Sequence, residues 1–247
     1  MKTLTFTCAI AALTMGVFAT DGTAPLGTFT WSAIGSWDYG KIADEGGIAT
    51  LSGKGEVTAT QDKNGLKLGG IDVVESSHAR ISGTETIQFT GNSSFVRSRN
   101  LAQDQQVLTL SVPIAAENLE TRGQRVNFAV TPVVSGKLTL GAADNYFTAG
   151  TTTLPNIVTK GAAGIQYEPS AAGTMTIPSL EVSSGRALIR VRTADSSVNI
   201  GSLSLDEVLQ RGRHERADVE QGGRDDPLRA VGGDGDSRRG RCQGEGR

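Results

Sequence analysis

The sequence has few of the residues that build reactive or metal-binding sites. It includes only two cysteines and two histidines. Cys8 lies in an N-terminal leader and Cys242 close to the C-terminus, so the body of the chain offers neither a disulfide nor a thiolate metal site. His78 is the one histidine before residue 209, and we interpret it as an exposed structural residue. A search for glycine-rich phosphate loops, G-x-S-x-G, H-E-x-x-H and EF-hand patterns finds none.

Neither part of the chain has an excess of positive charge. Residues 1–208 carry 15 Lys and Arg against 18 Asp and Glu, and residues 209–247 carry 9 against 8. A nucleic-acid-binding domain would be expected to carry a basic excess. The charge therefore predicts no nucleic-acid partner.

Residues 1–19 have the pattern of a secretory signal peptide. Lys2 is followed by a mostly apolar stretch over residues 5–18, and Val17-Phe18-Ala19 resembles a cleavage site. The stretch is shorter than the roughly 20 residues that a membrane-spanning helix needs. We therefore predict a secreted or cell-surface protein, bacterial because of its few cysteines, with no transmembrane segment after cleavage.

The body of the chain reads as β-structure. From Gly27 to Leu205, short runs of Thr, Val, Ile, Leu and Phe alternate with polar residues and are divided by turn residues. This pattern predicts an all-β fold, an antiparallel jelly-roll-like β-sandwich over residues 20–208. A β-helix is the alternative, but its coils should give a regular period, and the sequence shows none. Residues 114–123 could form a short helix, and residues 145–150 a long loop.

The alternation also predicts which side chains share a face. In "RVNFAV", Val126, Phe128 and Val130 fall on one side and Asn127 and Ala129 on the other. In "ALIRVRT", Arg190 and Arg192 fall on the side opposite Ile189 and Val191. The two arginines are either a solvated face or a site for an acidic polysaccharide, because a guanidinium matches a uronate carboxylate.

Residues 209–247 differ in composition from everything before them. They lack Ile, Thr, Phe, Tyr, Trp, Lys, Asn and Met and hold 9 of the 17 arginines. Such a composition predicts disorder. Three interpretations stay open: a solvated tail, a segment that begins as a helix after the capping box Ser204–Glu207, or an out-of-frame translation.

The most aromatic stretch is "GTFTWSAIGSWDYGKI". At strand spacing, Trp37 and Tyr39 would point the same way, and Asp38 lies between them. Such a face could bind a sugar ring, with Asp38 fixing its orientation. Core packing is the alternative for each tryptophan. The acidic pair Asp44-Glu45 makes a Ca²⁺ site possible, and no cofactor is otherwise indicated.

The closing strands, "SLEVSSGRALIRVRTADSSVNIGSLSL", resemble those of carbohydrate-binding β-sandwich modules. The chain is also similar to sandwich domains that precede the catalytic domains of some secreted pectate lyases, in Leu66–Gly70, Arg125–Leu140 and Ser197–Ile200. The resemblance covers roughly residues 27–205. It implies polysaccharide binding, with Asn199 in a sugar-contacting loop and Arg190 and Arg192 suited to an acidic sugar.

Three functions follow from these observations. The first is a secreted, non-catalytic carbohydrate-binding accessory domain, a fragment of a polysaccharide-degrading enzyme such as a pectate lyase. The second is a structural or adhesive surface protein, pilin-like or an envelope sandwich. The third is a complete enzyme whose site no motif reveals. Whether the chain is an enzyme stays open, and if it is part of one, we expect a polysaccharide lyase.

Overall fold

The computed structural model describes residues 19–24, 27–99 and 107–205. The signal peptide proposed for residues 1–19 lies almost wholly outside this range, and the proposed tail, 209–247, lies entirely outside it. Within it, no helix has both the length and the apolar character needed to cross a membrane.

The regular structure is almost entirely β, and strands make up 64% of the described chain. The strands are β1 (Gly22–Ala24), β2 (Gly27–Thr30), β3 (Gly47–Gln61), β4 (Lys67–Gly83), β5 (Ile87–Phe89), β6 (Phe95–Ser98), β7 (Val107–Ser111), β8 (Ile114–Ala116), β9 (Leu119–Phe128), β10 (Val133–Val134), β11 (Lys137–Phe147), β12 (Thr152–Thr153), β13 (Asn156–Thr159), β14 (Ala162–Tyr167), β15 (Thr174–Val182), β16 (Arg186–Val191) and β17 (Ser197–Leu205). Two short 3₁₀ helices, η1 (Ile34–Ser36) and η2 (Asp38–Gly40), follow β2.

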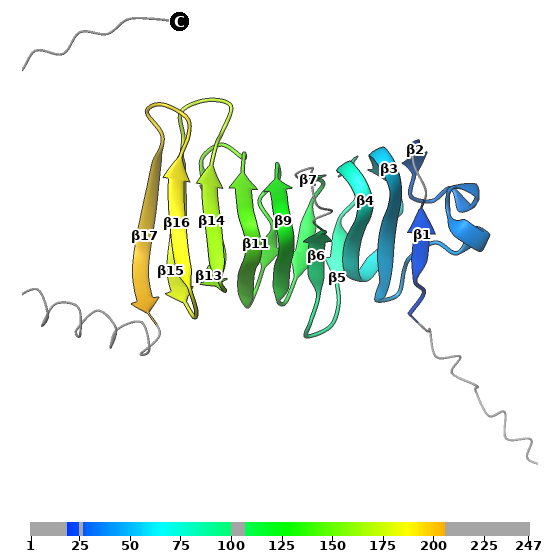
Figure 1. Cartoon of the computed structure of the whole chain (residues 1–247), viewed down its shortest axis with the longest axis horizontal. Helices are drawn as coiled ribbons and strands as arrows, with labels where there is room; N and C mark the ends of the chain where they lie inside the picture. Colours follow the sequence, from blue (N-terminus) through cyan, green and yellow to red (C-terminus); the bar gives the residue numbers. More distant parts are fainter. Residues whose placement is uncertain (1–18, 25–26, 100–106, 206–247) are drawn as a thin grey trace, which may run out of the picture. The chain divides into compact units, whose positions relative to one another are not determined.

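These strands form a parallel β-solenoid of about seven coils (Figure 1). Every strand pairing among the described residues is parallel, and the one antiparallel contact is an isolated bridge between Thr20 and Asp44. The predicted antiparallel sandwich is therefore wrong, and the β-helix alternative is the correct fold class. Residues 114–123 form β8 and the start of β9 instead of a helix.

Each coil contributes strands to three faces. Face 1 contains residues 22–24, 47–52, 70–73, 95–98, 119–122, 137–140, 156–159, 180–182 and 203–205. Face 2 contains residues 27–30, 55–61, 76–83, 107–111, 125–128, 144–147, 162–167 and 186–191. Face 3 contains residues 67–68, 87–89, 114–116, 133–134, 152–153, 174–177 and 197–200.

The core consists of ladders of apolar side chains that point into the solenoid and stack from coil to coil. On face 1, one ladder runs Leu119, Leu138, Ile157, Leu180 and Leu203. On face 2, the rings of Phe128 and Phe147 stack with centroids 5.4 Å apart. The alternation predicted for Val126, Asn127 and Phe128 is confirmed, because both apolar residues are fully buried and Asn127 is half-buried. The prediction for Val130 is wrong: β9 ends at Phe128, and Val130 is 38% exposed.

The corner between faces 1 and 2 depends on glycine and on buried polar groups. Gly123 has φ +93°, and a Cβ placed there would lie 1.7 Å from the Ser98 carbonyl oxygen of the preceding coil. One coil later, buried Asn145 donates to the carbonyls of Ala142 and Gly164 and accepts a bond of 2.6 Å from Thr121 Oγ1. Asn145, expected in a long loop, therefore lies in the core, where it links its own coil to the coils on both sides.

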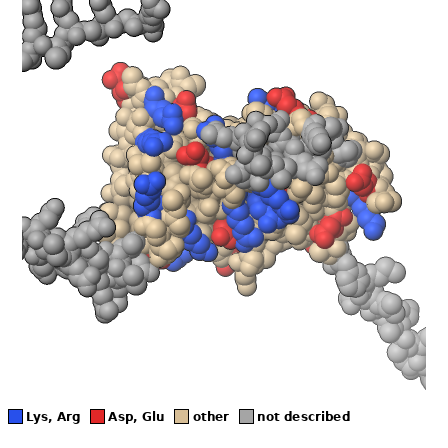
Figure 2. Space-filling view, in the orientation of Figure 1, with Lys and Arg blue, Asp and Glu red and all other residues tan. Residues whose placement is uncertain are grey.

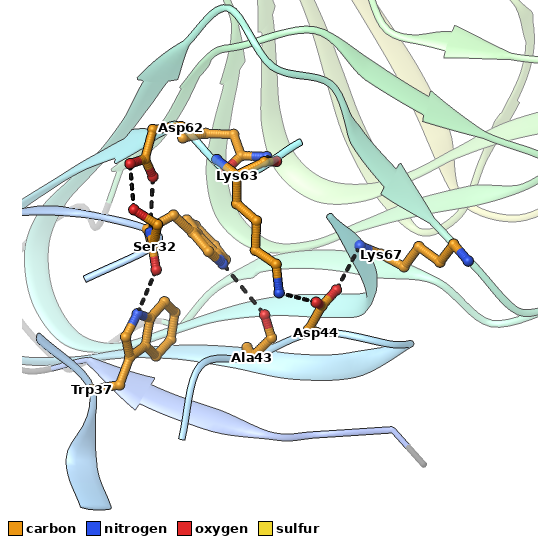
Figure 3. Close-up of polar contacts among 9 residues, drawn as sticks. Ser32, Trp37, Ala43, Asp44, Asp62, Lys63 and Lys67 are labelled. Carbon is orange, nitrogen blue, oxygen red and sulfur yellow. Dashed lines mark hydrogen bonds and ion pairs between the residues drawn. The ribbon is translucent and has the colours of Figure 1, made fainter. Parts of the chain in front are cut away.

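The N-terminal end of the solenoid is closed by an aromatic cluster. Trp31 and Trp37 are buried and meet edge-to-face at 5.1 Å, and Phe29 packs on Trp37 at 5.6 Å. Trp31 Nε1 donates to the Ala43 carbonyl, and Trp37 Nε1 donates to the Trp31 carbonyl (Figure 3). The segment that carries these residues covers the first coil.

Candidate functional site

Positively charged side chains gather on the outside of faces 1 and 2. Figure 2 shows Lys and Arg concentrated over the middle of the solenoid and again toward its C-terminal end on the face in view. Two groups of contacts organise this surface, and each is built around an aromatic ring. We call them the Phe95 centre (Asp72, Phe95, Arg97, Arg99, Glu120, Arg122) and the Tyr146 centre (Arg125, Asp144, Tyr146, Gln166, Arg192).

The Phe95 ring lies on the outside of face 1. It has room there because Gly70 is its partner on the preceding coil, and a Cβ at Gly70 would lie 2.7 Å from the ring. The guanidinium carbons of Arg97 and Arg122 lie 5.3 and 4.6 Å from the ring centroid. Both distances are within the range of cation–π attraction.

Asp72 orients two arginines: Arg97, which lies in β6, and Arg99, which follows it. Its carboxylate accepts bonds of 2.8 and 2.5 Å from Arg97 and of 3.1 and 2.5 Å from Arg99, so both pairs are bidentate. The Asp72 side chain is only 6% exposed. Burial raises the pKa of Asp72, but the hydrogen bonds and charges of Arg97 and Arg99 outweigh burial and hold this pKa below its usual value.

The next coils extend the same surface. Arg122 occupies the position that follows Arg97 in the ladder and bonds Glu120 Oε2 at 2.9 and 2.5 Å. Lys160 lies 3.5 Å from the other oxygen of Glu120. The side chains of Arg97, Arg99 and Arg122 are 32%, 46% and 37% exposed, so part of each guanidinium remains open to solvent.

The Tyr146 centre lies on the outside of face 2. The ring is largely buried, and the guanidinium carbons of Arg125 and Arg192 lie 4.7 and 5.6 Å from its centroid. Gln166 links the centre internally, because it accepts a bond of 3.0 Å from Arg192 Nε and donates one of 2.9 Å to Asp144. Arg125 and Asp144 approach to 4.0 Å.

The two centres share one chemical design. In each, two guanidiniums contact one ring and are oriented by a carboxylate or an amide, which reduces the freedom they would lose on binding. A partly exposed, oriented guanidinium presents paired N–H groups that match a carboxylate or a sulfate. Arg122 and Arg125 flank the bend at Gly123, so the centres meet at the corner of faces 1 and 2.

The structure places Trp37, Asp38 and Tyr39 in the segment of residues 31–46 that covers the first coil, which we call the cap. Residues 37–39 do not form a strand: Trp37 is buried, whereas Tyr39, with φ +56°, is 97% exposed in η2 beside exposed Asp38. The prediction that Trp37 and Tyr39 point the same way is wrong, because the chain turns between them.

Figure 3 shows the polar contacts that surround this cap. Asp62 accepts bonds from the backbone and the hydroxyl of Ser32, and Asp44 pairs with Lys63 and accepts a bond from the backbone of Lys67. Asp44, one of the carboxylates considered for Ca²⁺, thus has a structural partner. No group of three or more His, Cys, Asp and Glu among the described residues is arranged to hold a metal ion.

Arg190, Arg192 and Asn199 lie in the last coil. The predicted alternation of β16 is confirmed, because Ile189 pairs with buried Ile165 and Arg190 with outward-facing Gln166. Asn199 is exposed on face 3, within β17 rather than in a loop. The six predicted site residues are therefore not brought together, since β16 and β17 lie at the opposite end of the solenoid from the cap (Figure 1).

Sequence reasoning overlooked most of the two centres. "FVRSRN" does place Arg97 and Arg99 on one face by strand alternation, and the lone carboxylate of "GGIDVV" at Asp72 indicates a buried charge that needs a partner. Their pairing depends on which coil follows which, and the local pattern does not contain this information.

Face 3 has a shallow groove as well. It has a volume of about 720 Å³ and is lined by outward residues of three successive coils, among them Gln88, Ala115 and Val133, with Glu117 and Ser135 at the corner. The small side chains of β8 make the hollow. It has no charge pair or stacked ring comparable with the two centres.

Comparison of the chain with protein-family models, with curated proteins and with solved structures finds no match. The candidate site therefore rests on its own geometry.

Proposed function

We propose that this chain is a secreted, non-catalytic binding protein that holds an acidic polysaccharide against the outer surface of its solenoid. The observation that carries the proposal is the pair of rings, Phe95 and Tyr146, each contacted by two guanidiniums. The likeness to sandwich modules lends no support, because the fold is a solenoid.

The order of the charges along the coils favours a polymer over a small ligand. Arg97 and Arg122 occupy one ladder position on neighbouring coils, and Lys160 follows further along the same corner. Neighbouring parallel strands lie about 4.8 Å apart. Arg97 and Arg122 are one such step apart, and Lys160 lies two coils beyond Arg122, because Gly141 follows Arg122 on the ladder. Cations in this order can engage several acidic groups of one chain, and each guanidinium matches a uronate carboxylate. Several weak contacts on one polymer add up to useful affinity.

The second candidate function is a structural or adhesive role at the cell surface. The observation that favours it is the uncharged strand β17, which ends the described solenoid without a strand beyond it. Under this role the ion pairs of the two centres would serve the fold alone. Removing a guanidinium would then lower the stability of the fold without changing polysaccharide binding.

The test is affinity electrophoresis and calorimetry of the full chain with polygalacturonate, with a neutral galactan as the reference polymer. We expect binding to polygalacturonate that weakens with added salt, and no binding to galactan. The double variant Arg97→Gln/Arg122→Gln and the single variant Arg192→Gln should each weaken binding about three- to tenfold, since charged hydrogen bonds at half-exposed sites contribute about 1 kcal/mol.

Lys41→Gln is the matched control, because Lys41 is exposed and lies in the N-terminal cap, away from both centres. It removes one positive charge and should leave the affinity unchanged. Circular dichroism establishes that each variant is folded. Absence of binding by the unaltered chain, or equal weakening by Lys41→Gln, would refute the proposal.

A further inference from the structure

The C-terminal end of the described solenoid exposes residues that belong to its core. Leu203 continues the ladder of Leu138, Ile157 and Leu180 but is 60% exposed, and Ile200, which stacks on Ile177, is 38% exposed. Val191 stacks on Tyr167 and is 42% exposed. Inward-facing positions are open here because no described residue covers the last coil.

The last strands also lack a described neighbour on one side. Among the described residues, β17 pairs with β15 and β16 with β14, and no described strand lies along the outer edge of either. β17 is the outermost strand in Figure 1. Exposed edges of natural sheets are usually protected by charges or proline, but Ser197–Leu205 contains neither.

The opposite end cannot receive this surface. Residues 31–46 cover the first coil, and the backbone of Lys41 and Ala43 lies within 2.5 Å of where a Cβ on Gly22 would be. Head-to-tail stacking of copies into a filament is therefore blocked, which leaves contact between two like ends.

The order of residues in β17 fits such a contact. β17 turns from face 3 to face 1 at Gly201 and Ser202. From this corner a small, an apolar, a polar and an apolar residue follow in each direction, Gly201-Ile200-Asn199-Val198 toward the N-terminus and Ser202-Leu203-Ser204-Leu205 toward the C-terminus. Val198 and Ile200 stack on core residues of face 3, and Leu203 and Leu205 on those of face 1. The strand is thus self-complementary when it is paired with a reversed copy of itself.

We propose that two copies of the chain associate end to end through β17, about a two-fold axis at the corner of faces 1 and 3. The two β17 strands pair antiparallel, with Ile200 opposite Leu203 of the second copy and Asn199 opposite its Ser204. Face 1 of each copy continues into face 3 of the other, and the apolar ladders join into one core. An isologous contact of this kind closes on itself and gives a dimer.

The first test is sedimentation equilibrium of the full chain. We expect a monomer–dimer equilibrium. Leu203→Arg should raise the dissociation constant of the dimer at least about a hundredfold, because the two-fold symmetry places the substituted residue in the contact twice. Val133→Arg is the matched control: Val133 is 69% exposed but lies on face 3 in an earlier coil, and its variant should dimerise normally.

The second test reads the register. In a Cys8→Ser/Cys242→Ser background, Asn199→Cys and Ser204→Cys together should give a covalent dimer on mild oxidation, because residues opposite in an antiparallel pair lie about 5 Å apart. Each single cysteine variant should give none, since its opposite residue is not a cysteine. Within one copy the two positions lie too far apart along the extended strand to form a bridge.

Two results would overturn the proposal. One is a monomer at every concentration, which would mean that residues 206–247 or a different protein covers the end. The other is a dimer that Leu203→Arg leaves intact, which would place the contact elsewhere. Neither result bears on polysaccharide binding, because the Phe95 and Tyr146 centres lie on the outer surfaces of faces 1 and 2, and Arg192 is their one residue in the last coil.

Discussion

Replacement of Asp72 by asparagine tests whether the Phe95 centre is as tightly organised as its geometry indicates. Asp72 is 4% exposed and accepts four hydrogen bonds from Arg97 and Arg99. Removal of one partner from a fully buried ion pair costs about 3–5 kcal/mol. Both arginines are partly exposed and regain water, so we expect a loss of about 2 kcal/mol.

In a protein of this size, each kcal/mol lost from the free energy of unfolding lowers Tm by about 2–4 °C. Asp72→Asn should therefore lower Tm by about 4–8 °C at neutral pH. The loss should be largest at low ionic strength, because Arg97 and Arg99 then repel each other without the carboxylate between them. Differential scanning calorimetry over a salt series measures both effects. Glu181→Gln is the control, since Glu181 pairs with Lys137 in an exposed contact worth no more than about 0.5 kcal/mol.

The pH dependence gives an independent check with a definite sign. The folded-state pKa of Asp72 is lowered, so its contribution to stability is present above the unfolded-state value, about 3.9. This contribution is lost as the pH falls through the lower folded-state value. The Tm difference between the natural chain and Asp72→Asn should therefore be constant near neutrality and shrink in acid. Equal Tm losses for Asp72→Asn and Glu181→Gln, or a difference that grows in acid, would refute the reasoning.

Three further predictions address the corner, the core and the cap. Gly123→Ala should cost about 3 kcal/mol or more in urea denaturation, because it combines a positive φ with a backbone clash, whereas Gly150→Ala, with open space around it, should change stability by less than about 0.5 kcal/mol. Asn145→Ala should cost about 3 kcal/mol in the same assay, because it removes three hydrogen bonds from the core, two donated to carbonyls and one accepted from the Thr121 hydroxyl, and a loss below about 1 kcal/mol would contradict its role. Fluorescence from Trp31 and Trp37, the only tryptophans, should be blue-shifted and unchanged by polygalacturonate, and a spectral change on binding would instead place the ligand at the cap.

Local structure was predictable from the sequence because strand alternation depends only on neighbouring residues. The inward positions of Val126 and Phe128 and the outward position of Arg190 agree with the period of two. The same alternation occurs in antiparallel sandwiches and in parallel solenoids, so it could not decide between them. The prediction that Trp37 and Tyr39 point the same way was wrong for a different reason. It assumed the spacing of a strand, whereas these residues lie in and beside a 3₁₀ helix.

The solenoid escaped the search for a period because its coils differ in length. Gly22 pairs with Ala49, Leu51 with Val73, and Val107 with Arg125, so the step in sequence from one coil to the next shortens from the first of these pairs to the third. The register survives this variation because the added residues lie at corners, where a loop of any length can leave the stack and return to it. A regular period is thus a property of solenoids with uniform corners, and its absence does not exclude the fold.

The same geometry explains why the candidate site was harder to find than the core. An inward position must be apolar or hydrogen-bonded in every coil, so each coil repeats a recognisable pattern. An outward position has no such requirement, and Asp72, Arg97 and Arg122 succeed one another on one ladder although a whole coil of sequence separates each from the next. Side chains that are distant in sequence therefore become neighbours only once the corner lengths are known. In a solenoid, the register has to be established before any binding residue on its surface can be assigned.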